Sequence, residues 1–140
     1  MSKEFINILI AAHDLQRPPC HCLITGSLAL LLLGQMDREP HDLDIVVQDE
    51  DALKYLIENT RLTYKGCNTP EGGEKEYSPG ATYGYDDMRV CVFIDDMVAH
   101  PKSVMGLSLC APAKIWEAKQ RYANDDQGKH IKDIAGRSRP

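Results

Sequence analysis

Two aspartates separated by one residue stand out near the middle of the chain, in the segment 41–47, which reads HDLDIVV. The β-branched residues after them predict a strand over 42–47, where residues two apart point to the same face. The Cα atoms of Asp42 and Asp44 would then lie roughly 6.6 Å apart, from two rises of about 3.3 Å. Carboxylates at this spacing can hold one or two divalent cations, and oxygen ligands favour Mg²⁺ or Mn²⁺. The alternative is a pair of acids at the solvated start of a strand.

A Gly-Ser pair upstream of these aspartates could bind the phosphate group of a ligand. Gly26 and Ser27 follow a short apolar run, 20–25, which predicts a buried strand, and precede the helix-forming run 28–33, which Gly34 ends. Gly26 allows a tight turn and a close backbone approach, and the helix start presents N–H groups to an anion. The Ser27 hydroxyl adds a donor. The segment therefore predicts a phosphate cradle, or in the plainer interpretation an ordinary helix start.

Taken together, the Gly-Ser pair at 26–27, fourteen intervening residues and the Asp-Leu-Asp at 42–44 resemble a known signature. It is that of the DNA polymerase β-like nucleotidyltransferase superfamily, and the segment 20–47 is most similar to its abortive-infection (AbiEii-type) toxin group. Arg38 stands where that pattern has an arginine, while Pro40 replaces the usual threonine and a serine replaces the second glycine.

The resemblance implies a metal-dependent enzyme that transfers a nucleoside monophosphate from a nucleoside triphosphate to a hydroxyl of RNA, a protein or a small molecule. It further implies the toxin of a toxin–antitoxin system, with an antitoxin or a second chain as partner. The implied ligands of Mg²⁺ (or Mn²⁺), which are also the catalytic residues, are Asp42, Asp44 and Asp95. The implied nucleotide-binding residues are Gly26, Ser27, Arg38 and Lys119. The alternative function is a catalytically silent module of the same fold that binds or senses nucleotides or proteins.

The third carboxylate is open between two neighbours. Residues 89–94, RVCVFI, predict a strand that ends at Asp95 and Asp96. Adjacent strand residues point to opposite faces, so only one of these acids can face the metals. We choose Asp95 because it lies nearer the strand.

Periodicity predicts the elements that must position these residues. Apolar residues recur at helical spacing over 5–15, and helices are also expected over 49–59, from Pro112 onward and over 129–135. Residues 62–65 predict a short strand, and residues 66–88 a mobile functional loop or an irregular hairpin. The expected fold is α/β (α+β): one domain over 1–140, with a small mixed sheet, helices packed on it, C-terminal helices and a loose tail at 136–140.

Composition narrows the class of protein. The chain has 140 residues and a net charge of −5, which argues against a constitutive nucleic-acid binder. Residues 112–140 carry 7 Lys/Arg against 4 Asp/Glu, while the rest carries 9 against 17, so an anionic substrate could lie between the two parts. The longest apolar run, 28–33, is too short to span a membrane. Five cysteines without an export signal predict reduced thiols and a cytoplasmic protein.

Overall fold

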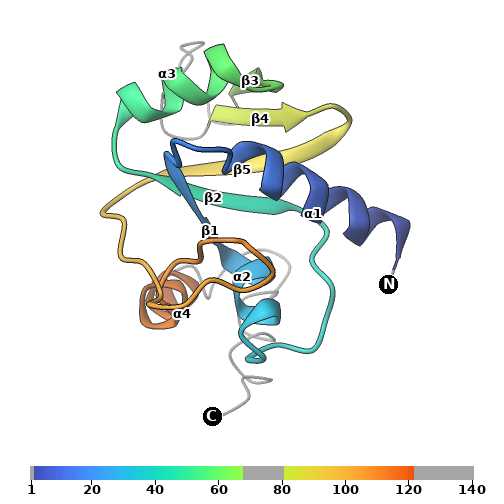
Figure 1. Cartoon of the computed structure of the whole chain (residues 1–140), viewed down its shortest axis with the longest axis vertical. Coiled ribbons are helices and arrows are strands. Elements are labelled where there is room, and N and C mark those ends of the chain that lie inside the picture. The colour runs from blue at the N-terminus through green and yellow to red at the C-terminus, as the bar shows by residue number, and fades with distance from the viewer. Residues whose placement is uncertain (1, 68–80, 122–140) are drawn as a thin grey trace.

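The structure is a computed structural model that describes residues 2–67 and 81–121 (Figure 1). Helices and strands alternate along these ranges. In chain order they are α1 (Lys3–Leu15), β1 (Cys22–Thr25), α2 (Gly26–Leu32), β2 (Leu43–Val47), α3 (Glu50–Asn59), β3 (Leu62–Cys67), β4 (Ala81–Tyr85), β5 (Met88–Ile94) and α4 (Pro112–Arg121).

The five strands form one mixed sheet in the order β1-β2-β5-β4-β3. The central pair, β2 and β5, is parallel, and the other neighbours are antiparallel. This arrangement confirms the expected α+β class with a small mixed sheet. It also confirms that the strand ending before Asp95 lies next to the strand that carries Asp44.

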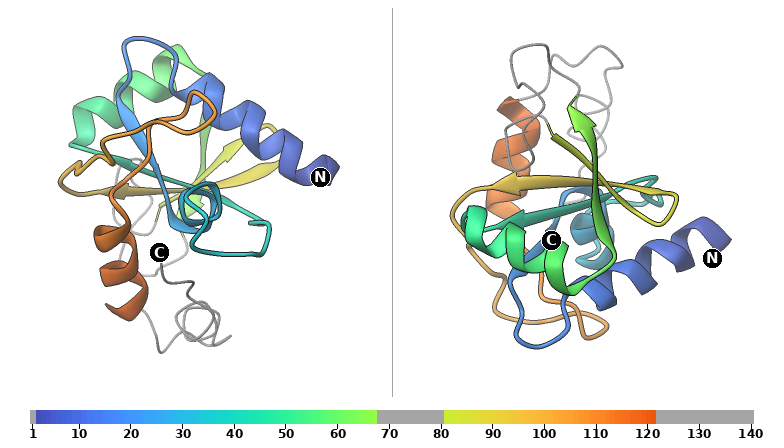
Figure 2. Two further views of the ribbon diagram at one scale, coloured as in Figure 1. Left: turned by 60° about the horizontal axis from the view of Figure 1, so that its bottom comes forward. Right: turned by 90° about the horizontal axis from the view of Figure 1, so that it is seen from above.

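The register divides the sheet into two faces with different roles. Residues paired across neighbouring strands share a face, so Ile24, Ile45 and Val92 point to one side, here called the core face. The opposite side, here called the site face, carries Asp44 and its paired neighbours Thr25 and Cys91. Figure 2 shows α1 and α3 on one side of the sheet and α4 on the other.

Helix α1 is built to cover the core face. The Ser2 hydroxyl accepts a hydrogen bond from the Phe5 N–H at 3.0 Å and caps its start. Its buried residues repeat at helical spacing and are Phe5, Ile8, Leu9, Ala11, Ala12 and Leu15. The thiol of Cys22 in β1 donates to the Leu15 carbonyl at 3.7 Å, which places α1 against this face.

A segment before α4 extends the sheet at β1. The Ile24 N–H donates to the Ser108 carbonyl at 3.0 Å, and the Cys110 N–H donates to the Ile24 carbonyl at 2.8 Å. The Gln16 side chain bridges Cys22 and Ser108 through hydrogen bonds to both backbones. These contacts hold the start of α4, two residues after Cys110, close to the end of β1.

Several expectations needed adjustment. The segment 66–88 is expected to be a mobile loop or an irregular hairpin. In the described part, β3 pairs antiparallel with β4, and the register shifts between Tyr64 and Gly66. The helical turns at 129–135 and the tail at 136–140 lie outside the described residues. No described helix has the length and apolar character that a membrane span requires.

Candidate functional site

The two central aspartates occupy the start of β2. Asp44 is the second residue of the strand, paired with Thr25 of β1 on one side and Cys91 of β5 on the other. Asp42 directly precedes the strand, and both carboxylates are half-buried. Asp44 shares the site face with its paired residue Cys91, and the negative charges of both acids act on the Cys91 thiol.

Gly26 leaves the space that the Asp44 carboxylate fills. The residue has a φ of +66°, in the left-handed region that favours glycine. A Cβ atom at position 26 would overlap with Oδ2 of Asp44, and with its Cβ and Cγ atoms at 2.9 Å. The turn from β1 into α2 can therefore bring the bare backbone against Asp44 only with glycine, as the sequence pattern suggested on conformational grounds alone.

Ser27 and Arg38 meet directly behind this turn. The Ser27 side chain is 6% exposed, and its Oγ accepts a hydrogen bond from Nη2 of Arg38 at 3.0 Å. Arg38 therefore ties the loop after α2 to the first turn of that helix. The family resemblance implies that both residues bind the nucleotide. The structure adds a contact between them that the sequence could not show.

A cavity of about 250 Å³ lies between the site face and α4. Gly26, Asp44 and Lys119 line it, as do both acids that follow β5. Lys119 is 4% exposed, although lysine is among the residue types least often buried. Helix α4 is anchored because Nε1 of Trp116 donates to Oε1 of Gln35 at 2.8 Å. The structure therefore brings together four predicted site residues from distant parts of the chain: Gly26, Asp44, Asp95 and Lys119.

The register separates Asp95 from Asp44 along the sheet. Cys91 is the β5 residue paired with Asp44, and Asp95 lies four residues further along, a distance of about 13 Å on a regular strand. The Asp95 N–H donates to the Val47 carbonyl at 3.1 Å, so this acid follows the far end of β2. Cys91 and Phe93 share the site face, as the choice of face for Asp95 assumed.

Cys91 is the neighbour of Asp44 that sequence reasoning missed. Burial, followed by the negative charge of Asp44, raises the pKa of its thiol from 9.0 to about 11, and Asp42 contributes in the same direction. A hydrogen bond between the thiol and the Asp44 carboxylate adds to this rise. The thiol is therefore protonated at neutral pH. The sequence indicates only that Cys91 lies two residues from both Arg89 and Phe93, so that the three residues share one face of the strand.

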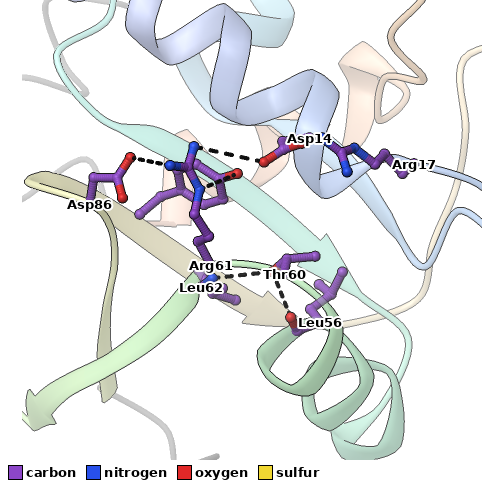
Figure 3. A network of polar contacts seen from close by, with 8 residues as sticks. Asp14, Arg17, Leu56, Thr60, Arg61, Leu62 and Asp86 are labelled. Carbon is purple, nitrogen blue, oxygen red and sulfur yellow. Dashed lines mark hydrogen bonds and ion pairs between the residues drawn. The ribbon is translucent and has the colours of Figure 1, made fainter.

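Asp42 also borders a groove of about 700 Å³ between α1 and the β4–β5 turn. Figure 3 shows Arg61 between Asp86 and Asp14. Its guanidinium lies 3.2 Å from Asp86 and 3.9 Å from Asp14, and its Nε donates to the Tyr85 hydroxyl at 3.3 Å. The guanidinium also lies over the Tyr85 ring, 4.8 Å from the centroid. These contacts join α1, the start of β3 and the β4–β5 turn.

Comparisons with known proteins support the fold. No protein-family model matches the chain, and no curated protein matches it in sequence. Among solved structures, the solution structure of the antibiotic-resistance factor ANT(2'')-Ia is similar, with a TM-score of 0.60 and 16% identity over 94% of this chain and 80% of that one. The crystal structure of ANT(2'')-Ia in complex with adenylyl-2''-tobramycin has a TM-score of 0.60 and 15% identity over 96% and 87% of the two chains. A nucleotidyltransferase from H. pylori has a TM-score of 0.53 and 16% identity over 96% and 66%. The chain therefore has the fold of these nucleotidyltransferases.

Proposed function

We propose that this chain is a nucleotidyltransferase that binds a nucleoside triphosphate in the cavity between the site face and α4. The observation that carries the proposal is the convergence on one cavity of a carboxylate from β2, a bare glycine backbone and a buried lysine. A carboxylate suits a phosphate-bound cation, while a glycine backbone and an ammonium group suit phosphate oxygens. The fold shared with nucleotidyltransferases supports the same function.

We further propose Mg²⁺ (or Mn²⁺) as the cofactor, held by Asp42 and Asp44. Within residues 2–67 and 81–121, no three His, Cys, Asp or Glu side chains gather closely enough to hold a metal ion. Two carboxylates nevertheless fit Mg²⁺, which is typically bound by one or two carboxylates together with substrate phosphates and water. When bound, such an ion would neutralise charge on the phosphate oxygens during transfer.

Residues of the chain itself would bind the triphosphate and accept the proton of the acceptor. Lys119 would contact the triphosphate, while Gly26 and Ser27, the latter held by Arg38, would present the start of α2 to it. The acceptor oxygen would attack the α-phosphorus in line, and pyrophosphate would leave. Asp95 would accept the acceptor proton. Asp95 lies further along β5 than Cys91, the residue paired with Asp44. It could therefore accept a proton only from an acceptor bound along β5, over Phe93.

The acceptor would be a hydroxyl of RNA, a protein or a small molecule. ANT(2'')-Ia, which has been captured with adenylyl-2''-tobramycin, offers a precedent for a small molecule on this fold. The resemblance of segment 20–47 to AbiEii-type toxins supports a role as a toxin, countered by an antitoxin chain. Growth arrest on expression, lost in the Asp44→Asn variant, would test this role.

Binding and transfer can be measured separately. Mg²⁺ and ATP together should raise the melting temperature more than either alone, since a ligand that binds the folded state stabilises it. Asp44→Asn should abolish this synergy, whereas Asp87→Asn, at an exposed turn position, should retain it. Release of pyrophosphate, with labelled phosphate from [α-³²P]ATP joined to RNA, protein or an aminoglycoside, would demonstrate transfer. Absence of synergy in the wild-type chain would contradict the proposed site.

A second candidate function is the catalytically silent module. The observation that favours it is the thiol of Cys91 beside Asp44, at a position where a carboxylate could contact the same cation. A silent module would bind Mg²⁺ and ATP together and release no pyrophosphate with any acceptor. The same assay therefore separates the two functions.

A further inference from the structure

A hydrogen bond between Trp116 and Gln35 joins the two helices that border the cavity. Nε1 of Trp116, on α4, donates to Oε1 of Gln35 at 2.8 Å. Gln35 follows α2 and is fixed to it, because its N–H donates to the Leu30 carbonyl at 2.8 Å. The helices α2 and α4 also pack against each other. The bond therefore links the helix that begins at Gly26 to the helix that carries Lys119.

The start of α4 is held separately, by the backbone. The Cys110 N–H donates to the Ile24 carbonyl at 2.8 Å, and the helix begins at Pro112. Bonds at one end of a helix fix where it begins, whereas its rotation about its own axis depends on how its side chains pack along its length. The Trp116 side chain is 4% exposed and its N–H has a defined partner, so this residue fixes the rotation of α4 against α2.

The rotation of α4 decides where Lys119 points. Lys119 lies three residues after Trp116, about 4.5 Å further along the helix axis. Its side chain is 4% exposed and lines the cavity together with Ile115, which lies four residues earlier on the same face of the helix. Trp116 is directed toward Gln35 instead. Rotation of α4 about its axis would therefore carry Lys119 out of its place in the cavity.

We propose that Trp116 and Gln35 are positioning residues for Lys119, whose hydrogen bond fixes the rotation of α4 so that the lysine ammonium group faces the triphosphate. This inference rests on the proposed nucleotide site. Neither residue belongs to the described lining of the cavity, so both act through Lys119 and not by contact with the nucleotide. Residues that act on a binding site without touching the ligand typically change affinity about 2–30-fold.

The test measures Mg-ATP affinity by calorimetry in variants that remove the bond and keep the bulk of the side chain. Trp116→Phe keeps an aromatic ring and lacks the donor, and Gln35→Met keeps the side-chain length and lacks the acceptor oxygen. We expect each to weaken Mg-ATP binding about fivefold. The double variant should lose no more than either single variant, because both remove the same bond. Ile8→Val, in the core on α1, is the control for lost stability alone and should bind within about twofold of wild type.

The variant Lys119→Met tests whether the bond acts through the lysine. In this background Trp116→Phe should cause no further loss of Mg-ATP affinity, because the group that it positions has already lost its charge. A further fivefold loss would show that Trp116 acts by another route and would overturn the positioning role.

The same measurements separate this inference from the nucleotide site on which it rests. If Lys119→Met binds Mg-ATP as tightly as wild type, the proposed contact of this lysine with the triphosphate is itself wrong. If Lys119→Met weakens binding while Trp116→Phe and Gln35→Met do not, the hydrogen bond serves only the fold and the positioning role is wrong, whatever the change in melting temperature. Should Trp116→Phe fail to fold, Gln35→Met, at a half-buried position after α2, removes the same bond.

Discussion

The cavity beside Asp44 and the groove beside Arg61 both contain charged residues, yet they are built in opposite ways. In the groove, Arg61 forms ion pairs with two acids from other elements, Asp86 and Asp14. In the cavity, a left-handed glycine is pressed against the Asp44 carboxylate, and Lys119 is only 4% exposed.

We expect this difference to separate a region that stabilises the fold from the cavity that we propose binds a ligand. Paired charges between α1, β3 and the β4–β5 turn hold these elements together and change little when a ligand binds. Features that cost stability are retained where function requires them. Substitution of Arg61 should therefore change stability, and substitutions in the cavity should change ligand binding.

The largest effect is expected at Gly26. Both Gly26 and Gly34 have positive φ values, +66° and +74°, so alanine at either position costs about 1 kcal/mol of backbone strain. Only at Gly26 would the new Cβ collide with Asp44, since nothing lies within 4 Å of a Cβ at Gly34. Gly26→Ala should weaken Mg-ATP binding by at least about 100-fold, roughly 2.7 kcal/mol, and Gly34→Ala by less than about twofold, measured by calorimetry. Equal losses would show that strain alone, and not the Asp44 contact, decides binding.

Lys119 should have the next largest effect on binding. Methionine at this position keeps the length and packing of the side chain and removes the charge that would contact phosphate. A charge-assisted hydrogen bond contributes about 2 kcal/mol, so Lys119→Met should weaken Mg-ATP binding about 30-fold. Lys102→Met, at an exposed lysine outside the cavity, should bind normally. Unchanged affinity in Lys119→Met would remove this lysine from the nucleotide site.

A pH-dependent effect is expected on the core face. Burial raises the pKa of the Cys22 thiol from 9.0 to about 12, so the folded state keeps this proton after the unfolded state has lost it. Its contribution to stability is complete below pH 9 and is lost as the pH rises toward 12. At pH 10.5 the loss should be about 2 kcal/mol.

Urea unfolding at pH 8 and pH 10.5 measures this effect. The decrease in unfolding free energy between the two pH values should be smaller by that amount in Cys22→Val, whatever the variant's absolute stability. An identical decrease in both proteins would mean that Cys22 ionises equally in the folded and unfolded states.

The smallest effect is expected at Arg61. Arg61→Leu removes the ion pairs with Asp86 and Asp14, and exposed pairs contribute at most about 1 kcal/mol. The free energy of unfolding should fall by about that amount, while Mg-ATP affinity should stay within about twofold of wild type. Arg17→Leu is the matched control, because Arg17 also contacts Asp14 but is 77% exposed, and its loss should cost less. A loss of Mg-ATP affinity in Arg61→Leu would mean that the groove takes part in ligand binding.

Local sequence was sufficient for the parts of this protein that depend on neighbours along the chain. The alternation around Asp44 predicted the strand that carries this acid, and the Gly-Ser pair predicted the sharp turn from β1 into α2. Pro112 correctly predicted the start of α4. Each of these features follows from side-chain periodicity or from the φ angles that glycine and proline permit.

Only the tertiary structure decided how these elements are aligned with one another. Periodicity defines the faces of a strand, but the offset between β2 and β5 depends on packing between segments more than forty residues apart in sequence. That offset put Cys91, and not Asp95, beside Asp44. The contact between Arg38 and Ser27 and the burial of Lys119 against the cavity likewise arise from long-range packing, which no local pattern encodes.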